Sequence, residues 1–110
     1  GETTSEKQAM GFWLDGQISA IVGTHTHVQT NDGRVLPQGT AYISDVGMTG
    51  ALNSVIGFRK EDSLKRFMTQ LPTRLEQEIS NEAIISAVVI ETNPSTGLAK
   101  SIKTIYQQIR

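Results

Sequence analysis

Apolar side chains near the amino end of the chain recur at helical spacing. Residues 3–6, Thr-Thr-Ser-Glu, have the form of a capping box. Ala9, Phe12 and Trp13 then fall on one helical face. The pattern predicts a helix over residues 4–15 that packs on a sheet, with Phe12 and Trp13 in the core.

Beyond this helix the chain alternates between short apolar runs and turn signals. Residues 19–23 are apolar and partly β-branched, which is typical of a strand buried on both faces. A helix that leads straight into such a strand matches the second half of a βαβ unit, so we expect a strand before Gly1. The mixture of elements predicts an α/β fold around one sheet or two packed sheets. Further strands are predicted at residues 34–36, 40–44, 84–92 and 98–109, and a second helix at residues 61–71. The last two strands are expected to form a hairpin with its turn at residues 93–97.

Composition narrows the class of protein. The chain has 110 residues, a formal net charge of −1 and 37% hydrophobic residues, so we expect a single domain over residues 1–110 that is neither disordered nor membrane-spanning. The near-neutral charge argues against a surface that binds nucleic acid. The sequence has no cysteine, which excludes disulfides and thiolate ligands and fits a cytoplasmic protein.

The two histidines of the chain, His25 and His27, stand one residue apart directly after the predicted strand at residues 19–23. Neutral imidazole is the commonest metal ligand in proteins, and zinc, iron or manganese would accept such a pair. In extended backbone both side chains would point to the same side, and in a loop they could converge through a turn. Two imidazoles do not complete a metal site, so the alternative is a pair of loop histidines hydrogen-bonded to the backbone.

Three other residues could support a site at the histidines. Asp45 ends a predicted strand, where it could accept a hydrogen bond from a ligating histidine or, in the interpretation that we favour, cap the glycine-rich loop at residues 46–50. Thr24 and Thr26 offer hydroxyl groups beside His25. No base is identifiable next to these hydroxyls, so we assign no catalytic residue in this chain.

Several longer stretches resemble one family of bacterial enzymes. The stretches are Thr4-Ser5-Glu6-Lys7, Gly23-Thr24-His25-Thr26-His27-Val28-Gln29-Thr30, Gly39-Thr40-Ala41-Tyr42-Ile43-Ser44-Asp45-Val46-Gly47-Met48-Thr49-Gly50 and Ser54-Val55-Ile56-Gly57. They are similar to the carboxy-terminal part of the YmdB-like metallophosphoesterases. That family belongs to the calcineurin-like phosphoesterase superfamily and is associated with phosphodiesterase activity on cyclic nucleotides, including 2′,3′-cyclic AMP.

The resemblance implies a fold, a metal centre and an activity. The fold of the family is a β-sandwich flanked by helices, so this chain would be a part of one that is incomplete at the amino terminus. The dinuclear centre of the family holds two divalent metal ions, with iron or manganese favoured over zinc, and His25 and His27 would bind one ion each. The remaining ligands would lie upstream of Gly1, so we expect the isolated chain neither to hold both ions nor to hydrolyse phosphodiesters.

Three hypotheses follow for what the chain does. The leading one is the carboxy-terminal portion of a metal-dependent phosphoesterase that acts on a small phosphodiester or nucleotide. The second is a stand-alone binding or assembly module that keeps part of the fold without catalysis. The third is a mononuclear metal protein that uses the histidines of two chains across a symmetric interface. An exposed sheet edge would also favour self-association into a homo-oligomer.

Overall fold

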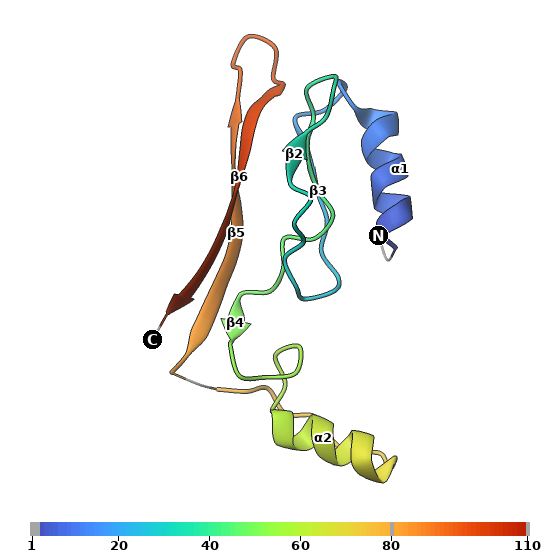
Figure 1. Ribbon diagram of the computed structural model, residues 1–110, viewed down its shortest axis with the longest axis vertical. Helices are drawn as coiled ribbons and strands as arrows, with labels where there is room; N and C mark the ends of the chain where they lie inside the picture. The colour runs from blue at the N-terminus through green and yellow to red at the C-terminus, as the bar shows by residue number, and fades with distance from the viewer. Residues whose placement is uncertain (1–2, 80, 110) are drawn as a thin grey trace. The chain divides into compact units, whose positions relative to one another are not determined.

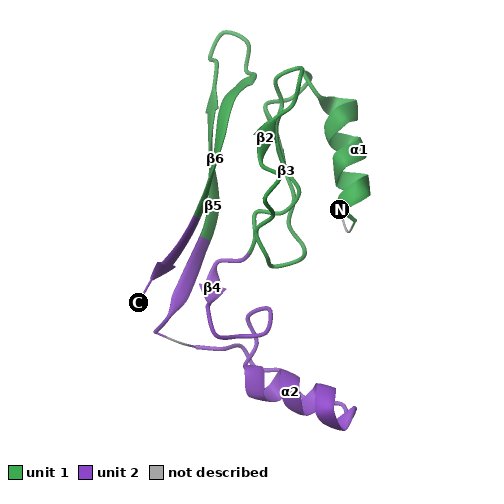
Figure 2. Cartoon of the chain, viewed as in Figure 1, with its two compact units in different colours: residues 1–47, 86–105 green, residues 48–85, 106–110 purple. Residues whose placement is uncertain are grey.

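The computed structural model describes residues 3–79 and 81–109 as a mixed α/β chain. The elements follow one another in the order α1, β1, β2, β3, β4, α2, β5, β6 (Figure 1). The chain divides into two compact units, with residues 1–47 and 86–105 in unit 1 and residues 48–85 and 106–110 in unit 2 (Figure 2). Within the described residues, no helix is long and apolar enough to cross a membrane.

The first part of unit 1 is a helix beside a small sheet. Helix α1 (Thr4–Leu14) begins where the Thr3 hydroxyl accepts a hydrogen bond from the amide of Glu6 at 3.2 Å, which confirms the predicted helix and its amino-terminal cap. The sheet has the order β1-β3-β2. Strand β1 (Ala20–Val22) runs parallel to β3 (Ala41–Ile43), and β2 (Arg34–Val35) runs antiparallel to it.

The core of unit 1 lies on the central strand β3. All three residues of β3 are buried, and Leu36 beside it is 3% exposed. Strand β1 lies at the edge of this sheet, and its Val22 is 48% exposed. The prediction of a strand buried on both faces at residues 19–23 is therefore wrong, because the run of apolar residues does not reveal whether a strand lies at the centre or at the edge of its sheet.

Helix α1 turns a different face to the sheet from the one that its apolar residues predict. The buried residues of the helix are Lys7 and Gly11, whereas Phe12 is 55% and Trp13 is 74% exposed. A β-carbon at Gly11 would lie 2.9 Å from the Tyr42 ring, so the helix approaches β3 closely only because residue 11 has no side chain. The prediction that Phe12 and Trp13 belong to the core is thus wrong.

A long hairpin follows near the end of the chain. Strands β5 (Ala83–Thr92) and β6 (Ala99–Ile109) are neighbours in the second sheet, which has the order β4-β5-β6. The turn between them closes with the amide of Gly97 donating to the carbonyl of Asn93 at 2.7 Å, and Gly97 takes a left-handed φ of 74°. Both strands and their turn confirm the elements predicted at residues 84–92 and 98–109.

Unit 2 holds strand β4 (Gly50–Ala51) and helix α2 (Lys60–Thr69). Strand β4 pairs antiparallel with β5, with Gly50 opposite Ile84. Helix α2 confirms the predicted second helix, yet none of its residues is buried. Its Phe67 and Met68 are 80% and 76% exposed. Helical spacing of apolar residues therefore predicted the helix correctly and says nothing of whether the apolar face is covered within the chain.

Candidate metal-binding site

The two histidines lie in an irregular loop of unit 1 that starts where β1 ends. Residues 24–28 have bend or unclassified backbone, and the side chains of His25 and His27 are exposed. The extended alternative for the pair is therefore excluded, and the loop alternative holds. His27 has a φ of 68°, which is uncommon for a residue with a side chain and is strained by about 1 to 3 kcal/mol.

One carboxylate, that of Asp45 at the end of β3, binds the residue between the histidines. Its Oδ2 atom accepts hydrogen bonds from the amide and from the hydroxyl of Thr26, each at 2.7 Å. Its Oδ1 atom accepts from the amide of Gly47 at 2.9 Å, which is the loop cap that the sequence predicts. The side chain of Asp45 is 1% exposed, so these bonds replace water almost completely.

The main chain of Asp45 binds the far end of the same loop. The amide of Asp45 donates to the Thr30 hydroxyl at 2.9 Å, and the amide of Thr30 donates to the carbonyl of Asp45 at 3.0 Å. Asp45 thus holds the loop at residue 26 through its carboxylate and at residue 30 through its backbone. The segment that includes His27 is anchored on both sides by one residue that follows β3.

Lys7 of α1 reaches the same carboxylate. Its ammonium nitrogen lies 4.0 Å from Asp45 Oδ2, and the two side chains are 7% and 1% exposed. Gly23 makes this approach possible: a β-carbon there would overlap the carbonyl of Ser44 and lie 3.0 Å from the Lys7 side chain. Burial raises the pKa of Asp45, but the hydrogen bonds from Thr26 and Gly47 and the charge of Lys7 outweigh it, so the pKa lies below its ordinary value of 3.8.

A second aspartate, Asp32, binds both Thr30 at the end of the loop and Ser44 directly after β3. Its carboxylate accepts from the Thr30 hydroxyl at 2.7 Å, from the Ser44 amide at 3.1 Å and from the Ser44 hydroxyl. Burial raises the pKa of Asp32, but these hydrogen bonds from Ser44 and Thr30 outweigh it and leave the pKa below 3.8. Asp32 therefore keeps its charge in mildly acidic solution.

The lowered pKa of Asp32 predicts an acid-sensitive contribution to stability. Because the folded pKa lies below the unfolded value of 3.8, the stabilisation by the carboxylate is fully present above that pH and is lost as the pH falls toward the folded pKa. We expect Asp32→Asn to lower the free energy of unfolding at about pH 6 and to have a smaller effect at about pH 3, measured by urea denaturation. An equal effect at both pH values would contradict the prediction.

Sequence reasoning missed several of the residues that build this site. The side-chain amide nitrogen of Gln29, Nε2, donates to the carbonyls of Val46, Ala87 and Ile105 at 3.1 to 3.2 Å, which ties the end of the loop to neighbouring segments of unit 1. A β-carbon at Gly47 would lie 2.7 Å from the backbone nitrogen of Gln29. Lys7, Gln29 and Gly47 all lie in the stretches that carry the family resemblance, and that was the only sequence signal for them.

The loop supplies only some of the ligands that a metal ion needs. His25 and His27 are appropriate ligands for iron, manganese or zinc. Within residues 3–79 and 81–109, however, no group of three or more His, Cys, Asp or Glu side chains is arranged to hold a metal ion. The two histidines fit as contributors to a metal centre and do not form one by themselves.

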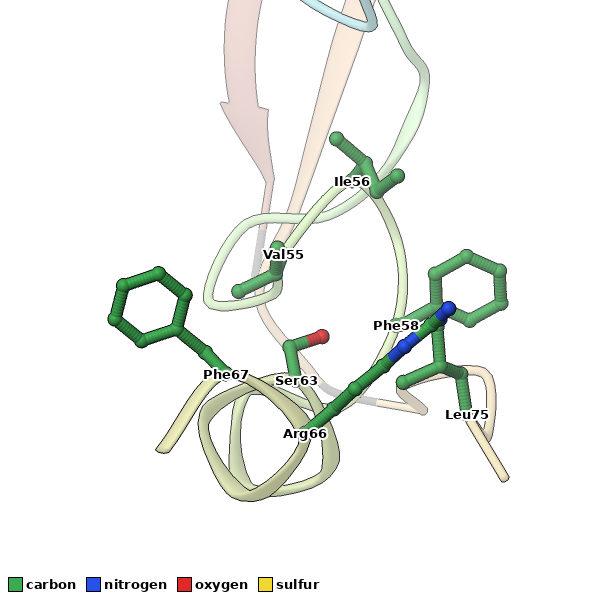
Figure 3. A pocket seen from close by; sticks show the side chains of 7 residues that line it. All are labelled: Val55, Ile56, Phe58, Ser63, Arg66, Phe67 and Leu75. Atoms are coloured by element: carbon green, nitrogen blue, oxygen red, sulfur yellow. The ribbon is translucent and has the colours of Figure 1, made fainter. Parts of the chain in front are cut away.

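A pocket in unit 2 has a different chemical character. It encloses about 330 Å³ and is lined by apolar side chains together with Ser63 and Arg66 (Figure 3). The lining includes no histidine or carboxylate, so the pocket is unsuited to a divalent cation. This pocket therefore offers none of the metal ligands that the histidine loop supplies.

Comparisons with known proteins identify the family to which the chain belongs. The model of the YmdB-like protein family matches residues 1–105. The 2′,3′-cyclic-nucleotide 2′-phosphodiesterase of Bacillus subtilis is 50% identical over 104 residues, which are 94% of this chain and 39% of that protein.

Two solved structures have the same fold. A hypothetical protein of Thermus thermophilus superposes with a TM-score of 0.90 at 39% identity, over 99% of this chain and 42% of that one. A phosphatase of Mycoplasma pneumoniae superposes with a TM-score of 0.87 at 36% identity, over 98% and 38% of the two chains. The chain therefore spans about two fifths of the relatives that it matches, and it belongs to the YmdB-like family.

Proposed function

We propose that this chain contributes to a metal-dependent phosphodiesterase that hydrolyses phosphodiesters such as 2′,3′-cyclic nucleotides in the cytoplasm. The observation that carries the proposal is the histidine loop, which is anchored at both ends by Asp45 and belongs to a chain half identical to a phosphodiesterase. His25 and His27 would each donate an imidazole nitrogen to one of two divalent ions, and other parts of the enzyme would supply the remaining ligands.

The chemistry of two-metal hydrolysis indicates which part of the metal centre this chain would supply. Two divalent ions, when bound close together, polarise phosphoryl oxygens and supply a hydroxide. This chain's own part is to hold two neutral imidazoles in place, since it offers no third ligand among the described residues. We propose that residues 1–110 form the carboxy-terminal part of one calcineurin-like β-sandwich domain, which is supported by the superposition on solved relatives.

The test is hydrolysis of 2′,3′-cyclic AMP by the complete natural polypeptide that carries these 110 residues and by the 110-residue chain alone. We expect the complete polypeptide to release the monophosphate, to lose activity in EDTA and to recover it with Mn²⁺ or Fe²⁺. The 110-residue chain is expected to show no hydrolysis above buffer. Hydrolysis that persists in EDTA, or no hydrolysis of any phosphodiester by the complete polypeptide, would overturn the proposal.

A further inference from the structure

Between the two candidate ligands lies Thr26, whose amide and hydroxyl both bond to another protein group. It gives both of its hydrogen-bond donors, the amide and the hydroxyl, to Asp45 Oδ2 at 2.7 Å. The amide of Val28 then donates to the Thr26 hydroxyl oxygen at 3.4 Å. Thr26 is therefore bonded to Asp45, just beyond β3, on one side and to the loop beyond His27 on the other.

The two carboxylate oxygens of Asp45 have different partners, and Oδ2 makes contacts that a loop cap does not require. Capping the glycine-rich loop requires only Oδ1, which accepts from Gly47. Oδ2 accepts both bonds from Thr26 and is the oxygen closest to Lys7. A buried carboxylate that needed only a cap would not require a buried lysine behind it, since the burial of each charge opposes folding unless it is compensated.

The backbone of His27 shows what the network holds in place. A left-handed φ at a histidine persists only where the surroundings over-determine it. Here the residue before His27 is bound by the Asp45 carboxylate, and Thr30 is bound by the Asp45 main chain. The strained conformation is thus set by protein groups that do not depend on a metal.

We propose that Lys7, Asp45 and Thr26 are positioning residues that fix the His25–His27 loop in its ligand-presenting conformation before metal binds. This inference rests on the proposed role of the histidines as ligands. Lys7 lies beside the carboxylate as its buried counter-charge, the carboxylate holds Thr26, and Thr26 sets the backbone from which both imidazoles project. A loop ordered in advance binds metal more tightly because the cost of ordering it is met during folding.

Zn²⁺ binding to the complete natural polypeptide that carries these 110 residues, measured by calorimetry, tests the inference with three variants and a matched control. We expect Thr26→Val and Asp45→Asn to weaken Zn²⁺ binding by about 10- to 100-fold, as is typical when the partners that orient metal ligands are lost. Thr26→Ser, which keeps the hydroxyl, is expected to bind as the unaltered chain does. The control is Asp15→Asn, since Asp15 also accepts two backbone hydrogen bonds in unit 1, from Gln38 at 2.8 Å and Thr40 at 3.2 Å.

A second readout reports on the loop without any metal. Hydrogen exchange by NMR should show that Asp45→Asn accelerates exchange of the Thr26 amide at least tenfold more than exchange of the Ala41 amide, which bonds to the Ser19 carbonyl at 3.0 Å and reports the global loss of stability. An equal loss of Zn²⁺ affinity in Asp15→Asn would show that lower overall stability weakens binding, and it would overturn the inference. Unaltered affinity in both Thr26→Val and Asp45→Asn would overturn it as well.

The outcomes also separate this inference from the proposed function. Zn²⁺ binding that survives His25→Ala and His27→Ala together would remove the proposed ligand role of the histidines, and the inference with it. Zn²⁺ binding that requires the histidines but is unchanged in Thr26→Val and Asp45→Asn would leave the proposed function standing and overturn only the positioning role.

Discussion

Replacing His27 with alanine in the complete polypeptide is expected to lower kcat/KM for 2′,3′-cyclic AMP by about three orders of magnitude. A metal ion at a phosphoryl oxygen stabilises transition-state charge by several kcal/mol, and about 1.4 kcal/mol corresponds to a factor of ten in rate. Alanine removes the imidazole nitrogen without adding bulk, and His27 is exposed, so the fold should be retained. His25→Ala is expected to have an effect of similar size, because each histidine would bind a different ion.

The activity measurement needs a metal analysis beside it. We expect the His27→Ala protein to contain about one metal ion fewer per chain by plasma mass spectrometry, in proportion to the lost ligand. Val28→Ala is the matched control, since Val28 is the next residue of the same loop, is 67% exposed and has no metal-binding atom. Full activity and full metal content in His27→Ala would refute the ligand role.

Removal of the Asp45 carboxylate is expected to have the largest effect on stability. Asp45→Asn leaves the ammonium group of Lys7 buried without its counter-charge, and breaking a buried ion pair costs about 3 to 5 kcal/mol in the free energy of unfolding. The 4.0 Å separation of the two groups is long for an ion pair, so we expect about 3 kcal/mol, the lower end of that range. Urea denaturation followed by circular dichroism measures this change.

A double-mutant cycle isolates the contribution of the pair. Lys7→Met removes the charge with little change of shape, and we expect the double variant Lys7→Met/Asp45→Asn to be more stable than the sum of the single effects predicts, by about 1 to 3 kcal/mol. The control cycle is Arg59→Met with Glu76→Gln, a pair 3.4 Å apart whose side chains are 43% and 58% exposed. Coupling there should be below about 1 kcal/mol. Equal coupling in the two cycles would refute the special role of burial.

Local signals in the sequence were sufficient for both helices, for the strands other than β4 and for the position of the histidine loop, whereas no strand was predicted at residues 50–51. The capping pattern at Thr3, the turn before Gly97 and the helical spacing in α2 all depend on residues a few positions apart, and the structure confirms each. The family resemblance also identified the stretch that carries His25 and His27. These predictions succeeded because short-range backbone preferences are recorded directly in neighbouring residues.

Only the tertiary structure decided which faces are buried and what holds the loop. Trp13 is exposed and Lys7 is buried because Gly11 lets α1 approach Tyr42, a residue of a strand far along the chain. Asp45 binds Thr26 and lies beside Lys7 because parallel pairing brings the ends of β1 and β3 together. The sequence by itself determined the elements other than β4 and the candidate ligands, whereas partners that are distant in sequence determined the burial, the ion pair and the anchoring of the site.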